Sequence, residues 1–153
     1  IAVHSNCPVL ITPGSNLDSF KFPENQNIAN HVYVAAFNFY GCVCSTEFTM
    51  QLSRQLLTAE YKGTVLSGWE NSIQMEKEGR AGAKKLYLTL IGGGVFNNPS
   101  EVIANAILSC EQLIVDSGLE VSLICFSKSD YARIQQYLDP LVEKTGGKII
   151  QAQ

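Results

Sequence analysis

"LIGGGVFNNPSE", residues 90–101, joins an apolar run to a helical pattern and has three consecutive glycines at the junction. The run that leads into it, "LYLTLI" at 86–91, predicts a strand that is buried on both faces. The residues at 98–101 predict a sharp helix start, with Asn98 as the N-cap and Pro99 at the first helical position. The glycines are therefore expected at the C-terminal end of a strand, where open α/β sheets bind their ligands.

The rest of the chain alternates apolar runs with helical patterns in the same way. Strands are predicted at 31–39, 86–91, 121–126 and 148–152, and a polar loop from the turn signal at 12–16 to residue 30. Helices are predicted from Ser45 or Thr46 to about Ile73, over the stripe 102–114, and from Ser129 or Asp130 to the glycines at 146–147. Strand and helix in alternation predict an α/β fold with helices on both faces of a sheet.

Length and composition restrict the class of protein. With 153 residues and 46% hydrophobic content, the chain is long enough for one domain, residues 1–153, and too short to suggest two. The formal net charge of -3 predicts no bulk nucleic-acid partner, because proteins of that kind cluster Lys and Arg. No apolar run approaches the roughly 20 residues of a membrane span, so we expect a soluble protein with no membrane partner.

The cysteines indicate a compartment rather than a site. They are Cys7, Cys42, Cys44, Cys110 and Cys125. Their odd number and irregular spacing predict neither a disulfide framework nor a metal site, and favour a reducing compartment such as the cytoplasm. Cys110 and Cys125 fall at apolar positions and are expected to be buried. Cys42 and Cys44 follow His31 along the chain, so a thiol and imidazole nucleophile is an alternative.

The glycine loop predicts an anion site. Free backbone N–H groups at Gly92, Gly93, Gly94, Val95 and Phe96, beside the positive end of a helix dipole, would form a cradle for a diphosphate. No GxxxxGK[ST] sequence follows, which disfavours a P-loop, and the third glycine of a dinucleotide fingerprint is absent. The alternative is that the glycines only permit a tight turn or close packing.

Residues 86–138 resemble the C-terminal half of a macrodomain. In that family an apolar strand leads into a small-residue loop of the type S/G-x-G-[IV]-[FY]-G, followed by a helix, a strand that ends in an aromatic residue, and a further helix start. This chain has residues 92–97 in place of the loop, Phe126 as the aromatic residue and Ser129-Asp130-Tyr131 at the helix start. The segments 55–72 and 31–39 are similar to the family's preceding helix and central strand. The resemblance implies a three-layer α/β/α fold with a mixed central sheet.

The resemblance also implies a ligand, which is ADP-ribose or an ADP-ribosylated protein, with no further cofactor. The residues implied to bind it are Gly92, Gly93, Gly94, Val95, Phe96 and Asn97 around the diphosphate and proximal ribose, and Phe126 and Ser127 near the adenine and its ribose. The family's Asn-Ala-Ala-Asn segment does not occur in this chain. The resemblance therefore implies one of two things. Either the missing elements precede Ile1 in a longer parent, or the ribose pocket is built differently. A second chain that completes the sheet is a further alternative.

Three functions follow as expectations. The first is hydrolysis of an ADP-ribosyl linkage, which needs a positioned water and a group that activates it. No motif assigns that group, although polar side chains are expected near the strand ends at Asn16, Asp18, Asn38, Asn97 and Asn98. The second function is ADP-ribose binding without turnover, and the third is a structural or protein-interaction role.

Overall fold

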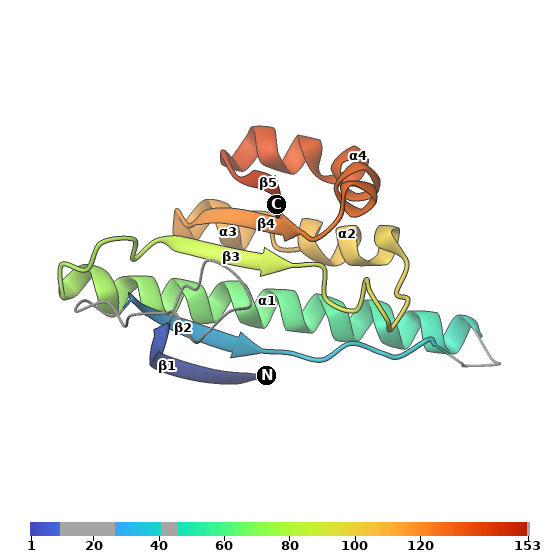
Figure 1. Ribbon diagram of the computed structural model, residues 1–153, viewed down its shortest axis with the longest axis horizontal. Coiled ribbons are helices and arrows are strands. Elements are labelled where there is room, and N and C mark those ends of the chain that lie inside the picture. The colour runs from blue at the N-terminus through green and yellow to red at the C-terminus, as the bar shows by residue number, and fades with distance from the viewer. Residues whose placement is uncertain (10–26, 41–45, 153) are drawn as a thin grey trace, which may run out of the picture. The chain divides into compact units, whose positions relative to one another are not determined.

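The computed structural model describes residues 1–9, 27–40 and 46–152 of the chain (Figure 1). These residues form two compact units, Ile1–Tyr33 (unit 1) and Val34–Gln153 (unit 2). The architecture is mixed α/β, with one antiparallel sheet in unit 1 and one parallel sheet in unit 2. Five of the residues named above lie outside the described ranges, namely Asn16, Asp18, Cys42, Cys44 and Ser45.

Unit 1 is a pair of antiparallel strands, β1 (Ala2–Val9) and β2 (Asn27–Tyr33). The pairing register shifts between His4 and Cys7, where Asn6 has a φ of 56°. The strand predicted at 31–39 is therefore misplaced. Strand β2 begins within the predicted loop and ends at Tyr33, because its extent is set by pairing with β1 rather than by its own composition.

Unit 2 carries four helices and a three-stranded sheet among its described residues. In chain order the elements are α1 (Glu47–Lys77), β3 (Lys85–Thr89), α2 (Ser100–Leu108), α3 (Glu111–Ser117), β4 (Glu120–Cys125), α4 (Lys128–Thr145) and β5 (Lys148–Gln151). The strand order is β3-β4-β5 and both pairings are parallel. The order of elements agrees with the prediction, except that the stripe at 102–114 forms two helices.

The parallel sheet buries one of its faces. Register places Leu88 beside Leu123 and Leu123 beside Ile149, and these residues pack with α1, α2 and α4 in a single core. The alternate residues point the other way, and Tyr87 is 61% and Ile150 39% exposed. The prediction that 86–91 is buried on both faces is therefore wrong for the strand itself. The described helices of unit 2 cover one face, so the predicted helices on the second face are not among them.

Local capping explains where the helices begin and end. Thr46 is the N-cap of α1, and its side chain forms a reciprocal capping box with Thr49. Ser127 caps α4 by accepting from the N–H of Asp130. Helix α4 ends at Gly146, whose φ of 69° lies in the left-handed region that favours glycine. The predicted start of α1 and the predicted end of α4 agree with these caps, whereas α1 continues to Lys77, past the predicted Ile73, and α4 begins at Lys128, before the predicted Ser129 or Asp130.

Candidate functional site

The loop between β3 and α2 contains the three consecutive glycines, and the first has a structural reason to be glycine. Gly92 has a φ of 75°. A Cβ atom there would lie 2.4 Å from Nδ2 of Asn98 and 2.5 Å from Cβ of Ala36. The backbone conformation therefore favours glycine at this position, and the space around it leaves no room for a Cβ atom.

Gly93 and Gly94 differ from each other. A Cβ atom on Gly93 would lie 3.2 Å from Cδ1 of Ile103 and 3.3 Å from the carbonyl oxygen of Leu90, so close packing accounts for this glycine. A Cβ atom on Gly94 would meet nothing within 4 Å, and Gly94 is not among the residues with a positive φ. Neither conformation nor packing among the described residues requires glycine at 94.

The backbone N–H groups of the loop divide into two sets. The N–H of Gly93 donates to Leu90 O at 3.0 Å, which contradicts its prediction as a free donor. Two more are used within the loop, since Asn97 donates to Gly94 O and Asn98 to Gly92 O, both at 2.9 Å. The N–H groups of Gly92, Gly94, Val95 and Phe96 have no acceptor in the described part of the chain, and the last three are consecutive and on exposed residues.

Asn98 does not have the predicted role. The N-cap of α2 is Pro99, and no side chain caps that helix end. Asn98 is 5% exposed, and its Nδ2 donates to Phe37 O at 2.7 Å and to Gly92 O at 3.2 Å. Its Oδ1 accepts from the hydroxyl of Ser53 on α1 at 2.7 Å. One buried amide therefore joins α1, the glycine loop and the segment at 34–39.

A buried tyrosine holds the strand end from the same helix. Tyr61 is fully buried, and its hydroxyl donates to Thr89 O at 2.7 Å and accepts from the N–H of Ile91 at 3.0 Å. Burial raises the pKa of Tyr61 strongly, so the group stays protonated. Sequence reasoning missed Tyr61 and Ser53. The available signal was their spacing, because with Leu57 and Val65 they recur every four residues and so share one face of the helix.

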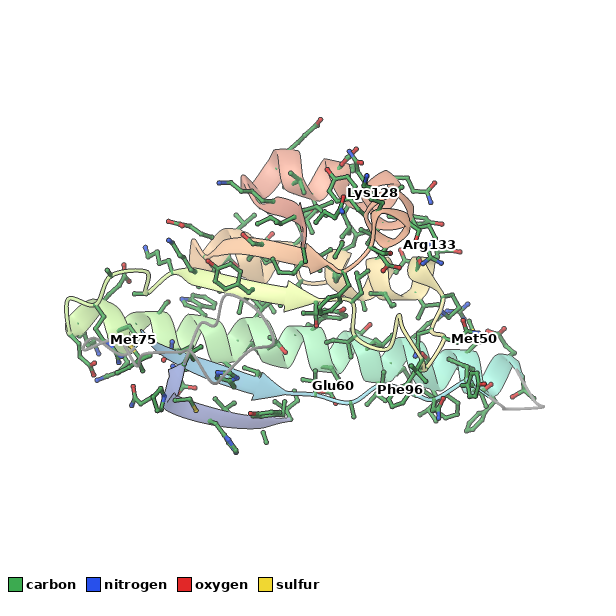
Figure 2. All side chains as sticks on the ribbon, viewed as in Figure 1. Met50, Glu60, Met75, Phe96, Lys128 and Arg133 are labelled. Atoms are coloured by element: carbon green, nitrogen blue, oxygen red, sulfur yellow. The ribbon has the colours of Figure 1, made fainter. Side chains whose placement is uncertain are left out.

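The second half of the predicted site lies at the end of β4. Phe126 is 76% exposed. The hydroxyl of Ser127 donates to Oδ2 of Asp130 at 2.6 Å. That bond, with further bonds from Arg133, lowers the pKa of Asp130. Because β3 and β4 are parallel, their C-terminal ends lie at the same edge of the sheet, and Figure 2 labels Phe96 and Arg133 on this side. No described hydrogen bond joins Phe126 or Ser127 to the glycine loop.

The loop has no basic side chain of its own. No Lys or Arg occurs between Lys85 and Lys128 along the chain. An anion at the loop would therefore be held by main-chain N–H groups and the N-terminal end of α2. On the segment beside it, the N–H of Phe39 donates to Phe96 O at 2.9 Å, and the rings of Phe37 and Phe39 are 4.9 Å apart.

The other predicted polar residues have different surroundings. Asn38 accepts from the N–H of Tyr40 at 2.9 Å, which is the turn-forming alternative for an asparagine. His31 lies in β2 with its ring stacked near Tyr33. Cys110 and Cys125 are buried, as predicted, and burial raises the pKa of both thiols. Within the described ranges, no three His, Cys, Asp or Glu side chains are placed to hold a metal ion.

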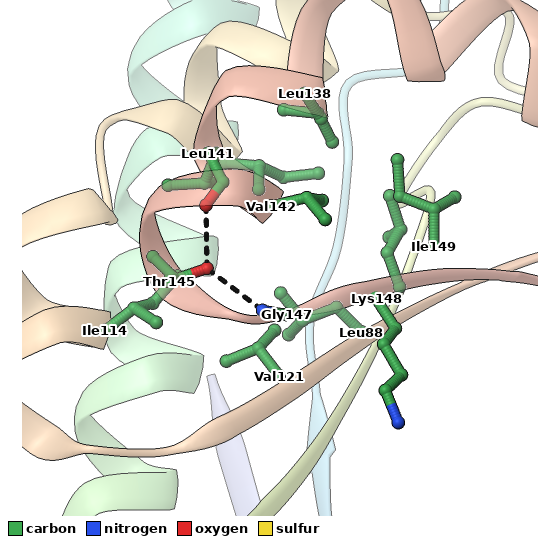
Figure 3. A pocket seen from close by; sticks show the side chains of 12 residues that line it. Leu88, Ile114, Val121, Leu138, Leu141, Val142, Thr145, Gly147, Lys148 and Ile149 are labelled. Atoms are coloured by element: carbon green, nitrogen blue, oxygen red, sulfur yellow. Dashed lines mark hydrogen bonds between the residues drawn. The ribbon is translucent and has the colours of Figure 1, made fainter.

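A cavity of about 30 Å³ lies beneath α4, between that helix and the sheet (Figure 3). Its walls are mainly apolar, and they include Leu138, Val142 and Ile149. Thr145 lies at its edge, where its hydroxyl donates to Leu141 O and accepts from the N–H of Gly147. A cavity of this size and polarity is a packing defect rather than a nucleotide site.

Comparison with models of known protein families, with curated proteins and with solved structures finds no match to this chain. Among the described residues, no helix combines the length and hydrophobicity needed to cross a bilayer.

Proposed function

We propose that the loop between β3 and α2 binds the diphosphate of ADP-ribose. The observation that carries this proposal is Gly94. Alanine at an ordinary φ in open space stabilises a chain relative to glycine, by roughly 0.4–1 kcal/mol, because it reduces the freedom of the unfolded state. Glycine at 94 thus lowers the stability of the chain. The positive φ that accounts for Gly92 and the close packing that accounts for Gly93 are both absent at this position. A ligand that approaches the main chain closely would explain it.

The N–H groups around Gly94 support the same ligand chemistry. Gly94, Val95 and Phe96 supply three consecutive donors without an acceptor in the described chain, and they precede the N-terminal end of α2. Consecutive main-chain donors beside a helix start favour phosphate oxygens. Because no Lys or Arg lies between Lys85 and Lys128 along the chain, we expect the loop to bind the diphosphate through hydrogen bonds more than through net charge.

ADP-ribose is chosen over other diphosphates because of the macrodomain resemblance. In this proposal Gly92, Gly93 and Asn97 shape the loop and Phe96 lies near the proximal ribose. Phe126 packs against the adenine, for which an exposed aromatic ring at a strand end is suited, and Ser127 lies near its ribose. The three-layer α/β/α arrangement with a mixed sheet belongs to the same proposal, as does completion of the sheet by an upstream segment or a second chain.

The proposed activity is hydrolysis of an ADP-ribosyl linkage on a protein or metabolite, and binding without turnover is the second candidate. Incubation with an ADP-ribosylated peptide separates the two. Release of free ADP-ribose supports hydrolysis, whereas saturable binding of an unchanged peptide supports the reader.

Gly94→Ala tests the binding site itself. We expect its affinity for ADP-ribose to fall about 10- to 100-fold, the loss of one or two charge-assisted hydrogen bonds, with unchanged or higher thermal stability. Val95→Ala is the matched control, because it shortens an exposed neighbouring side chain and keeps the amide. Calorimetric titration of the wild type, Gly94→Ala and Val95→Ala with ADP-ribose measures the three affinities. Equal affinity in Gly94→Ala and the wild type refutes the site.

A further inference from the structure

We infer that Asn98 is a positioning residue for the loop, and that Ser53 acts through it. Asn98 supplies two donors to the same acceptor, since both its backbone N–H and its Nδ2 bond to Gly92 O, at 2.9 and 3.2 Å. The loop from Gly92 to Asn98 is thereby closed on itself. The second bond of Nδ2, to Phe37 O at 2.7 Å, fixes the closed loop to the neighbouring segment.

The carbonyl oxygens of Gly92 and Phe37 set the direction of this amide, and the hydroxyl of Ser53 ties its other end to α1. Ser53 is fully buried and donates to Oδ1 of Asn98 at 2.7 Å. Because carbonyl oxygens only accept, Nδ2 must face Gly92 and Phe37, and Oδ1 is then the atom that accepts from Ser53. A flipped amide would set an oxygen against both carbonyl oxygens, which is unfavourable even though the Ser53 hydroxyl could accept from the N–H group. The orientation is therefore fixed by three partners on three separate segments.

The closed loop presents the donors that the proposed function requires. A turn within it, in which Asn97 N–H bonds to Gly94 O, spans Val95 and Phe96, and Phe96 O accepts from the N–H of Phe39. The carbonyl groups at Gly92, Gly94 and Phe96 are thus bonded within the chain, while the N–H groups of Gly94, Val95 and Phe96 have no acceptor among the described residues. The expected effect of Asn98 and Ser53 on affinity for ADP-ribose rests on the proposed function. Their effect on the conformation of the loop does not.

Two variants and a double variant test the inference. Asn98→Ala removes the amide that closes the loop and holds it to Phe37, called here the Asn98 latch, and Ser53→Ala keeps that amide but leaves its buried Oδ1 without a donor. Asn105→Ala, an exposed asparagine on α2, is the matched control. In hydrogen exchange, we expect Asn97 and Phe39 to lose protection in Asn98→Ala and to a lesser degree in Ser53→Ala, while α4 and the control keep the wild-type pattern.

Affinity for ADP-ribose provides a readout that a general loss of packing would not reproduce. Ser53→Ala is expected to weaken binding about five- to tenfold, the effect of one hydrogen bond, and to add no further loss in the Asn98→Ala background, because Ser53 acts only through Asn98. If the losses of affinity in Ser53→Ala and Asn98→Ala add in the double variant, Ser53 does not act through Asn98. If the amides of Asn97 and Phe39 keep their wild-type hydrogen-exchange protection in Asn98→Ala, Asn98 does not hold the loop closed. If the wild type does not bind ADP-ribose, the proposed function fails, and exchange alone decides for or against the latch.

Discussion

Tyr61→Phe removes one buried oxygen and leaves the ring in place, so it isolates the contribution of two hydrogen bonds to the strand end. Thr89 O loses a donor at 2.7 Å and the N–H of Ile91 loses an acceptor at 3.0 Å. These two backbone groups still bond to each other at 3.0 Å, so neither is left without a partner. We therefore expect the free energy of unfolding to fall by about 1–2 kcal/mol, which is less than the full cost of leaving a buried polar group without a partner.

The assay is denaturant unfolding followed by the fluorescence of Trp69, the single tryptophan of the chain, which lies on α1 in unit 2. The midpoint is expected to fall without a change in slope. In thermal unfolding the loss corresponds to about 2–4 °C per kcal/mol for a chain of this length. Tyr87→Phe is the matched control, since Tyr87 is 61% exposed on β3, and its effect is expected within about 0.5 kcal/mol of zero. Equal stability of the two variants would refute the anchoring role of Tyr61.

Three further predictions concern stability. Glu60 is 7% exposed and its Oε2 has no hydrogen-bond partner in the described chain, so Glu60→Gln is expected to raise the unfolding free energy by about 1 kcal/mol; a loss in urea titration would contradict this. The pKa of Asp130 is lowered in the folded chain, so its stabilising effect is fully present above the unfolded pKa of about 3.9 and is lost as the pH falls through the folded pKa. The melting temperature of Asp130→Asn should therefore lie below that of the wild type at neutral pH, and the difference should close as the pH falls through the folded pKa of Asp130. Val142→Ile adds one methylene to the cavity beneath α4 and is expected to gain up to about 0.8 kcal/mol by calorimetry, whereas a loss above 1 kcal/mol would indicate overpacking.

The order of elements in unit 2 could be predicted because each has a local signal. The apolar spacing of α4, the cap at Thr46 and the glycine at 146 act over a few residues, and all appear where the sequence places them. The apolar spacing of α1 does not, because Leu52, Leu66 and Ile73 are exposed and the helix buries another face that includes Leu57 and Tyr61. Solvent exposure of one sheet face could not be predicted in this way. The run at 86–91 reads as continuously apolar, yet the exposure of Tyr87 depends on which elements cover the sheet.

The candidate site was predictable in its position and less so in its internal bonding. The glycines do lie between a strand and a helix, at the expected sheet edge. Asn98 fits the consensus for an N-cap, but its side chain bonds to Ser53, which is 45 residues away along the chain, and to the carbonyl group of Phe37. Long-range partners of this kind leave no local pattern. The separate reasons for Gly92 and Gly93 likewise depend on atoms that tertiary structure brings close.

The central claim is that main-chain N–H groups of the glycine loop bind a diphosphate. Its most direct test is a titration of the isotopically labelled chain with ADP-ribose, followed by the backbone amide resonances. If these groups bind the diphosphate, saturable shifts are expected at Gly94, Val95 and Phe96, with smaller shifts at Gly93 and Asn98, whose N–H groups are already bonded to the chain. Unmoved resonances at 94–96 up to millimolar ADP-ribose would contradict it.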